Sequence, residues 1–137
     1  MRKSILFLIL FSVILSFSCK KLVQQQEQNE ALNIMTNGVW QVSQYLQDST
    51  DITTTLSSYT FQFKSDGTVT GTNGTLTVTG TWTTDIASRT ITSQFPANSG
   101  AVNELDATWK ITDSSTDYVI AHSTINSNTN NLKLVKK

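Results

Sequence analysis

Threonine alternates with apolar residues along the middle of the chain, and this pattern constrains the fold more than any other feature. In residues 75–83 every second residue is threonine, and the residues between are leucine, valine, glycine and tryptophan. Residues 59–64 repeat the alternation with aromatic side chains on one face. Because successive side chains of a strand point to opposite faces of a sheet, the pattern predicts antiparallel strands with one apolar face.

Two turn signals join these strands into a meander. Ser65-Asp66-Gly67 predicts one turn, and Asn73-Gly74 has the composition of a two-residue hairpin turn. In the strand that follows, Gly80 takes one of the positions between the alternating threonines. A glycine there indicates a bend or a close packing contact.

The rest of the chain continues in short strands. A helix is predicted from about residue 27 to residue 36, where Asn37-Gly38 ends it, and residues 103–106 are an expected corner. The eight expected strands span residues 38–46, 59–64, 68–72, 75–84, 89–94, 108–112, 118–122 and 132–135. Such a chain folds as an up-and-down barrel or as a sandwich, and barrel closure removes exposed edge strands.

The N-terminus has the features of a bacterial lipoprotein signal. Arg2 and Lys3 precede an apolar run over residues 5–17, and the single cysteine of the sequence, Cys19, follows Ser18. A run of this length suits a secretion signal but is shorter than the roughly 20 residues of a membrane-spanning helix. We expect residues 1–18 to be removed and Cys19 to carry lipid. Lys20 stands where an aspartate often accompanies retention in the inner membrane, so the outer membrane is favoured.

The processed chain divides into a short tether and one domain. Residues 19–30 are polar and rich in glutamine, which predicts a tether or a loosely helical spacer, and residues 31–137 suffice for one core. Loss of Arg2 and Lys3 leaves eight basic against ten acidic side chains, a net charge of −2. The lysines and arginines of the domain are scattered singly and form no basic patch, so we do not expect the protein to bind nucleic acid.

Several short motifs of the domain resemble those of a known family. Gly38-Val39-Trp40 is similar to the Gly-x-Trp opening of lipocalins, and the later motifs resemble those of small lipocalin-like domains in Bacteroidota lipoproteins. These later motifs are Tyr59-Thr60-Phe61-Gln62-Phe63, Asp66-Gly67-Thr68-Val69, Gly80-Thr81-Trp82 and Leu105-Asp106-Ala107-Thr108-Trp109. The resemblance implies an all-β, eight-stranded antiparallel up-and-down barrel with a short N-terminal helix. The chain departs from lipocalins in its shorter length, in lacking a C-terminal helix, and in lacking the arginine near the last strand that covers the tryptophan, where only Lys133 is nearby. These departures argue against a spacious ligand cavity.

The candidate site residues are aromatic. Six side chains are expected either to line a cavity or to fill the barrel: Trp40, Tyr59, Phe61, Phe63, Trp82 and Trp109. The remaining core is expected to include Val78, Ile91, Ile111, Ile120 and Leu134. Because eight-stranded barrels are often filled by their own side chains, a filled core is the stronger expectation.

No set of polar residues indicates catalysis or a metal. His122 is the single histidine, is expected to be solvated near a strand end, and has no cysteine or carboxylate cluster near it in the sequence. The pairs Asp48 with Asp51 and Asp113 with Asp117 fall in expected turns, where aspartate bonds to local backbone. We therefore expect no enzyme activity, no metal and no cofactor. The polar tract 126–131 is expected to be a solvated hairpin loop.

Two functional hypotheses remain from the sequence. The first is an outer-membrane-anchored lipoprotein whose barrel binds a small apolar ligand or a partner in the cell envelope. The second is a structural or interaction lipoprotein with a filled barrel and no small-molecule ligand. In either case the long loops over residues 47–57 and 95–106 are the expected sites of specificity, since binding residues concentrate on loops over a rigid scaffold.

Overall fold

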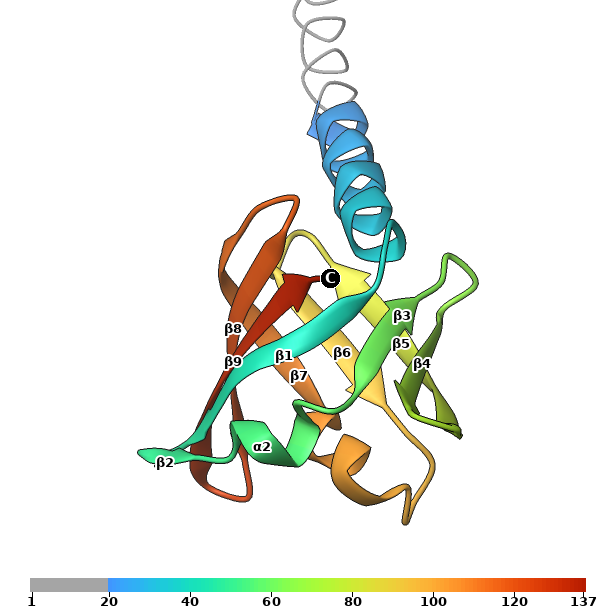
Figure 1. Ribbon diagram of the computed structural model, residues 1–137. Coiled ribbons are helices and arrows are strands. Elements are labelled where there is room, and N and C mark those ends of the chain that lie inside the picture. Colours follow the sequence, from blue (N-terminus) through green and yellow to red (C-terminus); the bar gives the residue numbers. More distant parts are fainter. Residues whose placement is uncertain (1–19) are drawn as a thin grey trace, which may run out of the picture.

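Eight antiparallel strands close into a barrel in the computed structural model, which describes residues 20–137 (Figure 1). The eight barrel strands are β1 (Trp40–Gln47), β3 (Thr60–Phe63), β4 (Thr68–Asn73), β5 (Leu76–Asp85), β6 (Thr90–Gln94), β7 (Ala107–Ser114), β8 (Tyr118–Ile125) and β9 (Asn128–Lys136). A ninth strand, β2 (Thr50–Asp51), lies outside the closed ring. The helices are an N-terminal helix over residues 20–36, α2 (Thr53–Leu56) and the 3₁₀-helix η1 (Gly100–Leu105). Residues 1–18 and Cys19, on which the signal and lipidation predictions fall, lie outside the described residues.

The strands follow one another around the barrel in chain order. Each pairs with the next from β3 to β9, and β1 pairs with both β3 and β9, which closes the sheet. The two-residue strand β2 pairs with β1 and extends from the barrel. The prediction of an eight-stranded antiparallel up-and-down barrel with an N-terminal helix is therefore confirmed.

The β4–β5 hairpin turns one residue later than the sequence predicts. Asn73 pairs with Leu76, so Gly74 and Thr75 are the two turn residues and Asn73 remains in the strand. Gly74 has a φ of +59°, the positive value that a type II′ turn requires at its first central position. The expectation of an Asn73-Gly74 turn was wrong because glycine takes this position without strain.

The polar tract 126–131 is mostly strand, which corrects the expected loop. Only Asn126 and Ser127 form the turn, and both have positive φ as in a type I′ hairpin. Residues 128–131 pair with β8 and belong to β9. Asn130 has no exposed surface at all, so this residue contributes to the core rather than to a solvated loop.

The core contains most of the expected apolar residues, with one exchange on β8. Ile91 and Leu134 are buried, while Val78 and Ile111 are partly buried and pack against the core. On β8 the inward residues are Val119 and Ala121, and Ile120 lies on the other face. The placement of Ile120 in the core was wrong because β8 carries apolar residues on both faces, so alternation does not decide which face is inward.

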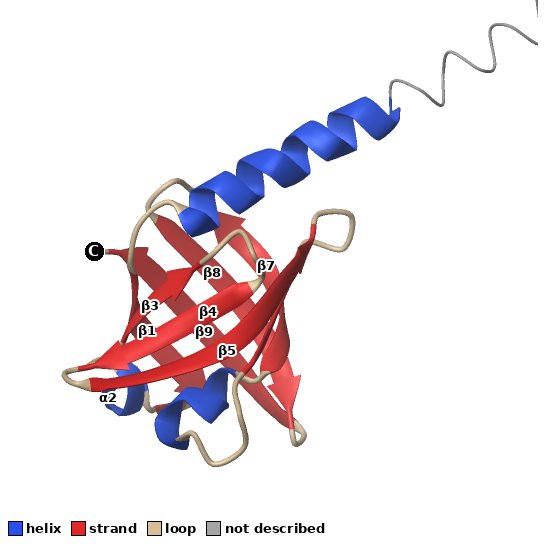
Figure 2. Ribbon diagram, turned by 90° about the vertical axis from the view of Figure 1, so that its right-hand side faces the viewer, coloured by secondary structure: helices blue, strands red, loops and turns tan. Residues whose placement is uncertain are grey.

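The two ends of the barrel are closed by different elements (Figures 1 and 2). At one end the N-terminal helix packs Leu32, Ile34 and Met35 against the core. At the opposite end α2 contributes the fully buried Leu56, and η1, at the expected corner, contributes the fully buried Val102. The helix already includes residue 20, whereas the sequence predicts its start at about residue 27, so the described part of the expected tether is helical. In the part of the chain that the structure describes, no helix is both long and apolar enough to cross a membrane.

Candidate functional site

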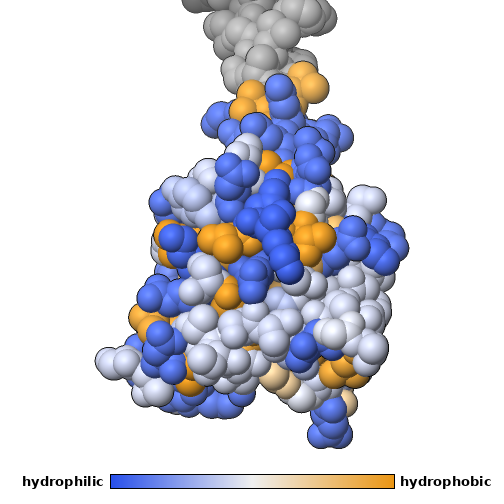
Figure 3. All heavy atoms as spheres, in the orientation of Figure 1, coloured by the Kyte–Doolittle hydropathy of each residue, from blue (hydrophilic) through white to orange (hydrophobic). Residues whose placement is uncertain are grey.

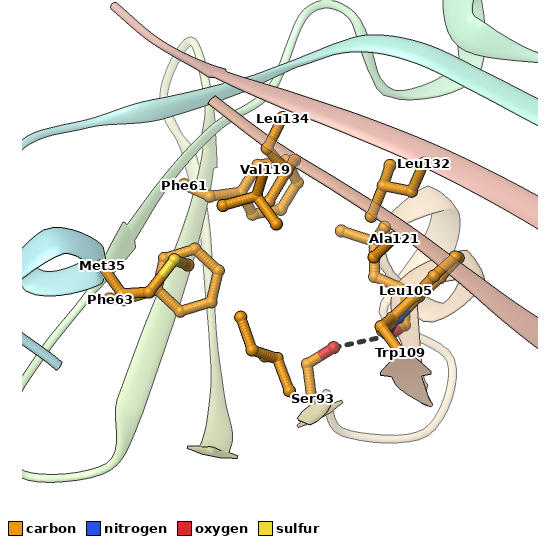
Figure 4. A pocket seen from close by; sticks show the side chains of 11 residues that line it. Met35, Phe61, Phe63, Ser93, Leu105, Trp109, Val119, Ala121, Leu132 and Leu134 are labelled. Carbon is orange, nitrogen blue, oxygen red and sulfur yellow. Dashed lines mark hydrogen bonds between the residues drawn. The ribbon is translucent and has the colours of Figure 1, made fainter. Parts of the chain in front are cut away.

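The barrel interior holds one small cavity near the N-terminal helix. Its volume is about 30 Å³, and its lining includes Met35 of the helix, Phe61 and Phe63 of β3, and Trp109 of β7 (Figure 4). Sites for small organic ligands usually measure about 300–1,000 Å³. The cavity is therefore an order of magnitude too small for a typical ligand.

The lining of this cavity offers no free polar group to a ligand. Ser93 is its one polar residue, and the Ser93 hydroxyl donates to the carbonyl oxygen of Leu105 at 2.6 Å. The indole Nε1–H of Trp109 donates to the same oxygen at 3.0 Å. Every polar atom on the wall thus already has a partner, and an apolar void of this kind stays dry.

The six predicted aromatic residues are all buried, but the structure does not bring them into one site. Their exposed fractions range from 0% for Trp40 to 7% for Phe63. Phe61, Phe63 and Trp109 line the small cavity, whereas Trp40, Tyr59 and Trp82 lie outside its lining.

Trp40 connects the helix to the barrel. Its Nε1–H donates to the carbonyl oxygen of Met35 at 2.9 Å, and the Lys136 ammonium lies 5.2 Å from the centre of a Trp40 ring. Lys133, the basic residue noted near the last strand, lies over Tyr118 and not over Trp40. Gly38 leaves the space that the Lys136 side chain occupies, because a Cβ at this position would approach the Lys136 Cδ to 3.1 Å.

Trp82 and Trp109 make comparable anchoring contacts. The Nε1–H of Trp82 donates to the carbonyl oxygen of Lys64 at 2.8 Å. The Trp82 ring packs edge to face against the Phe63 ring, with 5.2 Å between the ring centroids. The Trp109 ring packs edge to face against the Tyr45 ring, with 5.8 Å between the ring centroids. Since all three indole N–H groups donate to backbone, the tryptophans fasten the barrel to its turns and to its helix.

The sequence did not single out a polar pair in the core, Tyr45 and Asn130. The Tyr45 hydroxyl donates to the carbonyl oxygen of Glu104 at 2.8 Å and lies 3.5 Å from Asn130 Oδ1. Burial, reinforced by the negative charge of Glu104, raises the pKa of Tyr45 to about 12. A bulge between Val42 and Gln44 shifts the register of β1, and this shift turns Tyr45 inward against the simple alternation.

The expected local backbone bonding is found at Asp51 and at Asp113, which accepts from the backbone N–H of Ser114, although both residues lie in strands rather than in turns. Asp48 bonds instead to a strand far along the chain. Asp48 accepts a hydrogen bond from the backbone N–H of Thr129, and Asp51 accepts one from that of Thr53. The hydrogen bond from the Thr53 side chain, followed by that from its backbone, lowers the pKa of Asp51. Asp113 accepts a hydrogen bond from the Tyr118 hydroxyl at 3.0 Å, and that bond raises the pKa of Tyr118.

The remaining ionisable residues of the described part of the chain form no cluster of metal ligands. His122 is exposed and lies within β8 rather than at a strand end. Among residues 20–137, no group of three or more histidine, cysteine, aspartate or glutamate side chains is arranged to hold a metal ion.

The two long loops cover one end of the barrel. In the loop over residues 47–57, the Thr53 hydroxyl accepts a hydrogen bond from the backbone N–H of Tyr45. In the loop over residues 95–106, the Asp106 carboxylate accepts from the backbone N–H of Phe95 at 2.6 Å and from the Asn103 side chain at 2.8 Å. Both loops are tied to the barrel and present a defined surface at this end.

A larger hollow lies outside the barrel, between the helix and the β5–β6 turn. Its volume is about 290 Å³, and its lining includes Glu27 and Ala31 of the helix, Ile86 and Arg89 of the turn, and Ile111 of β7. Its lining therefore combines apolar side chains with charges of both signs.

Comparison with known proteins gives a likeness of fold. No protein-family model matches the chain, and no curated protein matches it in sequence. One similar solved structure is a DUF4847 family protein from Bacteroides vulgatus, with a TM-score of 0.57 and 16% sequence identity. The match covers 78% of this chain and 97% of that protein. The barrel is thus an architecture that a Bacteroides protein also uses, and at this identity the likeness extends to the fold alone.

Proposed function

We propose that the protein is a lipid-anchored, non-catalytic module of the cell envelope, with a filled barrel that presents its loop end to another envelope component. The observation that carries this proposal is the filled interior. The cavity of about 30 Å³ is enclosed by apolar side chains and by Ser93, whose hydroxyl already has a partner.

The positions of the two barrel ends support the same function. The N-terminal helix leads from one end toward Cys19, and α2 and η1 close the opposite end. With lipid on Cys19, the end with the loops over residues 47–57 and 95–106 faces away from the attached membrane. These loops are tied down by hydrogen bonds, so a partner would meet a preformed surface.

A ligand titration tests the filled barrel. The processed chain is titrated with fatty acids, retinoids and haem while tryptophan emission is recorded. Since the three tryptophans are at most 3% exposed, we expect blue-shifted emission and no saturable change. A saturable change with one ligand, removed by Trp109→Leu, would contradict a filled barrel.

Membrane fractionation tests the anchor separately. We expect the native chain to incorporate labelled fatty acid and to float with membranes, and the Cys19→Ser chain to remain in the soluble fraction without label. Asn29→Ser, at an exposed position further along the helix, is the matched control and should behave as the native chain. Membrane association of the Cys19→Ser chain equal to that of the native chain would refute the lipid anchor.

A second candidate function is the binding of a small apolar ligand inside the barrel. One observation favours it: Met35 of the helix forms part of the cavity wall, and methionine is a flexible side chain. Movement of the helix would enlarge the space beside Phe63 and Trp109. The same titration separates the two functions, because only this second candidate gives a saturable response.

A further inference from the structure

Two exposed apolar residues begin the described helix. Leu22 is 66% exposed and Val23 is 54% exposed, and they are neighbours in the first turn. The other large apolar side chain of residues 20–137 with comparable exposure is Leu76, in the β4–β5 hairpin at a distance from the helix. Figure 3 shows apolar surface at the start of the described helix and polar surface between it and the barrel.

The charge pattern of the helix changes at the same place. Lys20 and Lys21 directly precede the apolar pair, and the next charged residue in the sequence is the acidic Glu27. The first turn therefore combines two positive charges with two apolar side chains. This combination suits the boundary between anionic headgroups and acyl chains of a lipid leaflet.

The occupant of this surface follows from where the turn lies in the chain. Lys20 is bonded directly to Cys19, so a lipid on that cysteine holds the first turn at the headgroups. We propose that Lys20, Lys21, Leu22 and Val23 form a second membrane contact, in which the lysines bind anionic headgroups and the apolar pair enters the leaflet. This inference rests on the proposed lipid anchor.

The contact would turn the helix into a rigid spacer. The last turn of the helix is fixed to the barrel by the Met35 side chain and by the hydrogen bond from Trp40. Residues 20–35 rise by about 22 Å along a helix axis. A first turn fixed to lipid and a last turn fixed to the barrel together set both the height and the orientation of the barrel above the membrane.

A fluorescent probe tests the contact in the lipidated full chain. Because lipid blocks the Cys19 sulfur, Val23→Cys supplies the single free thiol for an environment-sensitive dye. Vesicles contain equal parts of phosphatidylcholine and phosphatidylglycerol, with or without a lipid-borne quencher. We expect blue-shifted emission and strong quenching at residue 23. Glu30→Cys, two turns further along the same helix face, is the control and should give emission typical of water.

Two variants test whether the first helix turn itself binds lipid or is only held near the membrane by the lipid on Cys19. Leu22→Ser in the Val23→Cys chain should reduce quenching, since it removes the apolar neighbour that holds the turn in lipid. Replacing both lysines by glutamine should weaken the contact by about fivefold for each charge in anionic vesicles, and leave it unchanged in pure phosphatidylcholine.

Each result decides between the proposals. A probe at residue 23 that resembles the control, on protein that still floats with the vesicles, would overturn the second contact and leave the anchor intact. Quenching that is unchanged by Leu22→Ser would also overturn the second contact. So would a loss of quenching in the lysine variants that is equal in anionic vesicles and in pure phosphatidylcholine. Protein that fails to float at all would refute the anchor itself.

Discussion

Gly80 occupies the most crowded glycine position of the barrel. A Cβ at this position would lie 2.4 Å from the carbonyl oxygen of Gln94 and 2.8 Å from Cδ1 of Phe95. Gln94 ends β6, so the first obstacle is backbone rather than a side chain that can rotate away. Gly80→Ala therefore forces β5 and β6 apart where they begin to pair.

The expected loss of stability follows from these contacts. Overpacking a core usually costs about 1–3 kcal/mol, and a backbone obstacle places Gly80→Ala in the upper part of that range. Replacing glycine by alanine also lowers the conformational entropy of the unfolded chain, which stabilises the folded state by about 0.4–1 kcal/mol. We expect a net loss of about 2 kcal/mol in the free energy of unfolding. For a domain of this size that lowers Tm by about 9 °C.

Gly71 supplies the matched control in the neighbouring strand. Like Gly80 it is buried in a strand and lacks a positive φ, but its Cβ would meet side chains, Phe61 at 3.0 Å and Val102 at 3.2 Å. Side chains can move by a few tenths of an ångström, so Gly71→Ala should cost about 1 kcal/mol or less.

Denaturant unfolding followed by tryptophan emission measures both variants. The midpoint should fall further for Gly80→Ala than for Gly71→Ala, with the slope unchanged if the unfolded states are alike. An unchanged midpoint for Gly80→Ala, or a larger loss for Gly71→Ala, would refute the assignment of the cost to the β6 backbone.

Three further predictions concern the helix and the polar pair of the core. Met35→Ala should release the last helix turn at a cost of about 2–3 kcal/mol, seen as faster amide exchange in residues 31–36 with strand protection unchanged. Asn130→Asp buries a carboxylate, so its stability at pH 7 should fall by more than about 2 kcal/mol and recover as acidification protonates the group. Because the folded-state pKa of Tyr45 is raised to about 12, its contribution to stability is complete below pH 10 and is lost as pH rises from 10 to 12. Tyr45→Phe should therefore remove the loss of stability between pH 10 and pH 12. A pH dependence of stability identical to that of the native chain would contradict this prediction.

The strands could be predicted from the sequence because their side chains follow a simple period. Residues 75–83 alternate threonine with apolar residues, and the observed β5 spans Leu76–Asp85. Alternation is a local property, so it identifies a strand without knowledge of its neighbours. It fails where both faces carry apolar residues, which is why Ile120 was placed inside instead of Val119.

The parts that escaped prediction depend on contacts between distant segments. Tyr45 faces inward because a bulge in β1 shifts its register against β9, and the local sign of that bulge is the pair of polar residues, Ser43 and Gln44, that breaks the alternation. Asn130 is buried because β9 begins within the polar tract and places this residue beside the Tyr45 hydroxyl of the neighbouring strand β1. Met35 closes the cavity because the helix folds back onto the barrel, a position that no local pattern encodes.

Trp40 has a structural role that bears directly on function. It pairs with Lys136 of β9 and with Phe61 of β3, so it lies where the barrel closes, and its indole also holds the end of the helix. Barrel closure and helix attachment are therefore coupled through one side chain. A lipid on Cys19 would then act through a fixed helix, so the loop end would keep one orientation toward its surroundings. A carrier of small ligands needs an accessible interior, whereas a presenting scaffold needs a fixed orientation. The filled core and the fixed helix both match the scaffold.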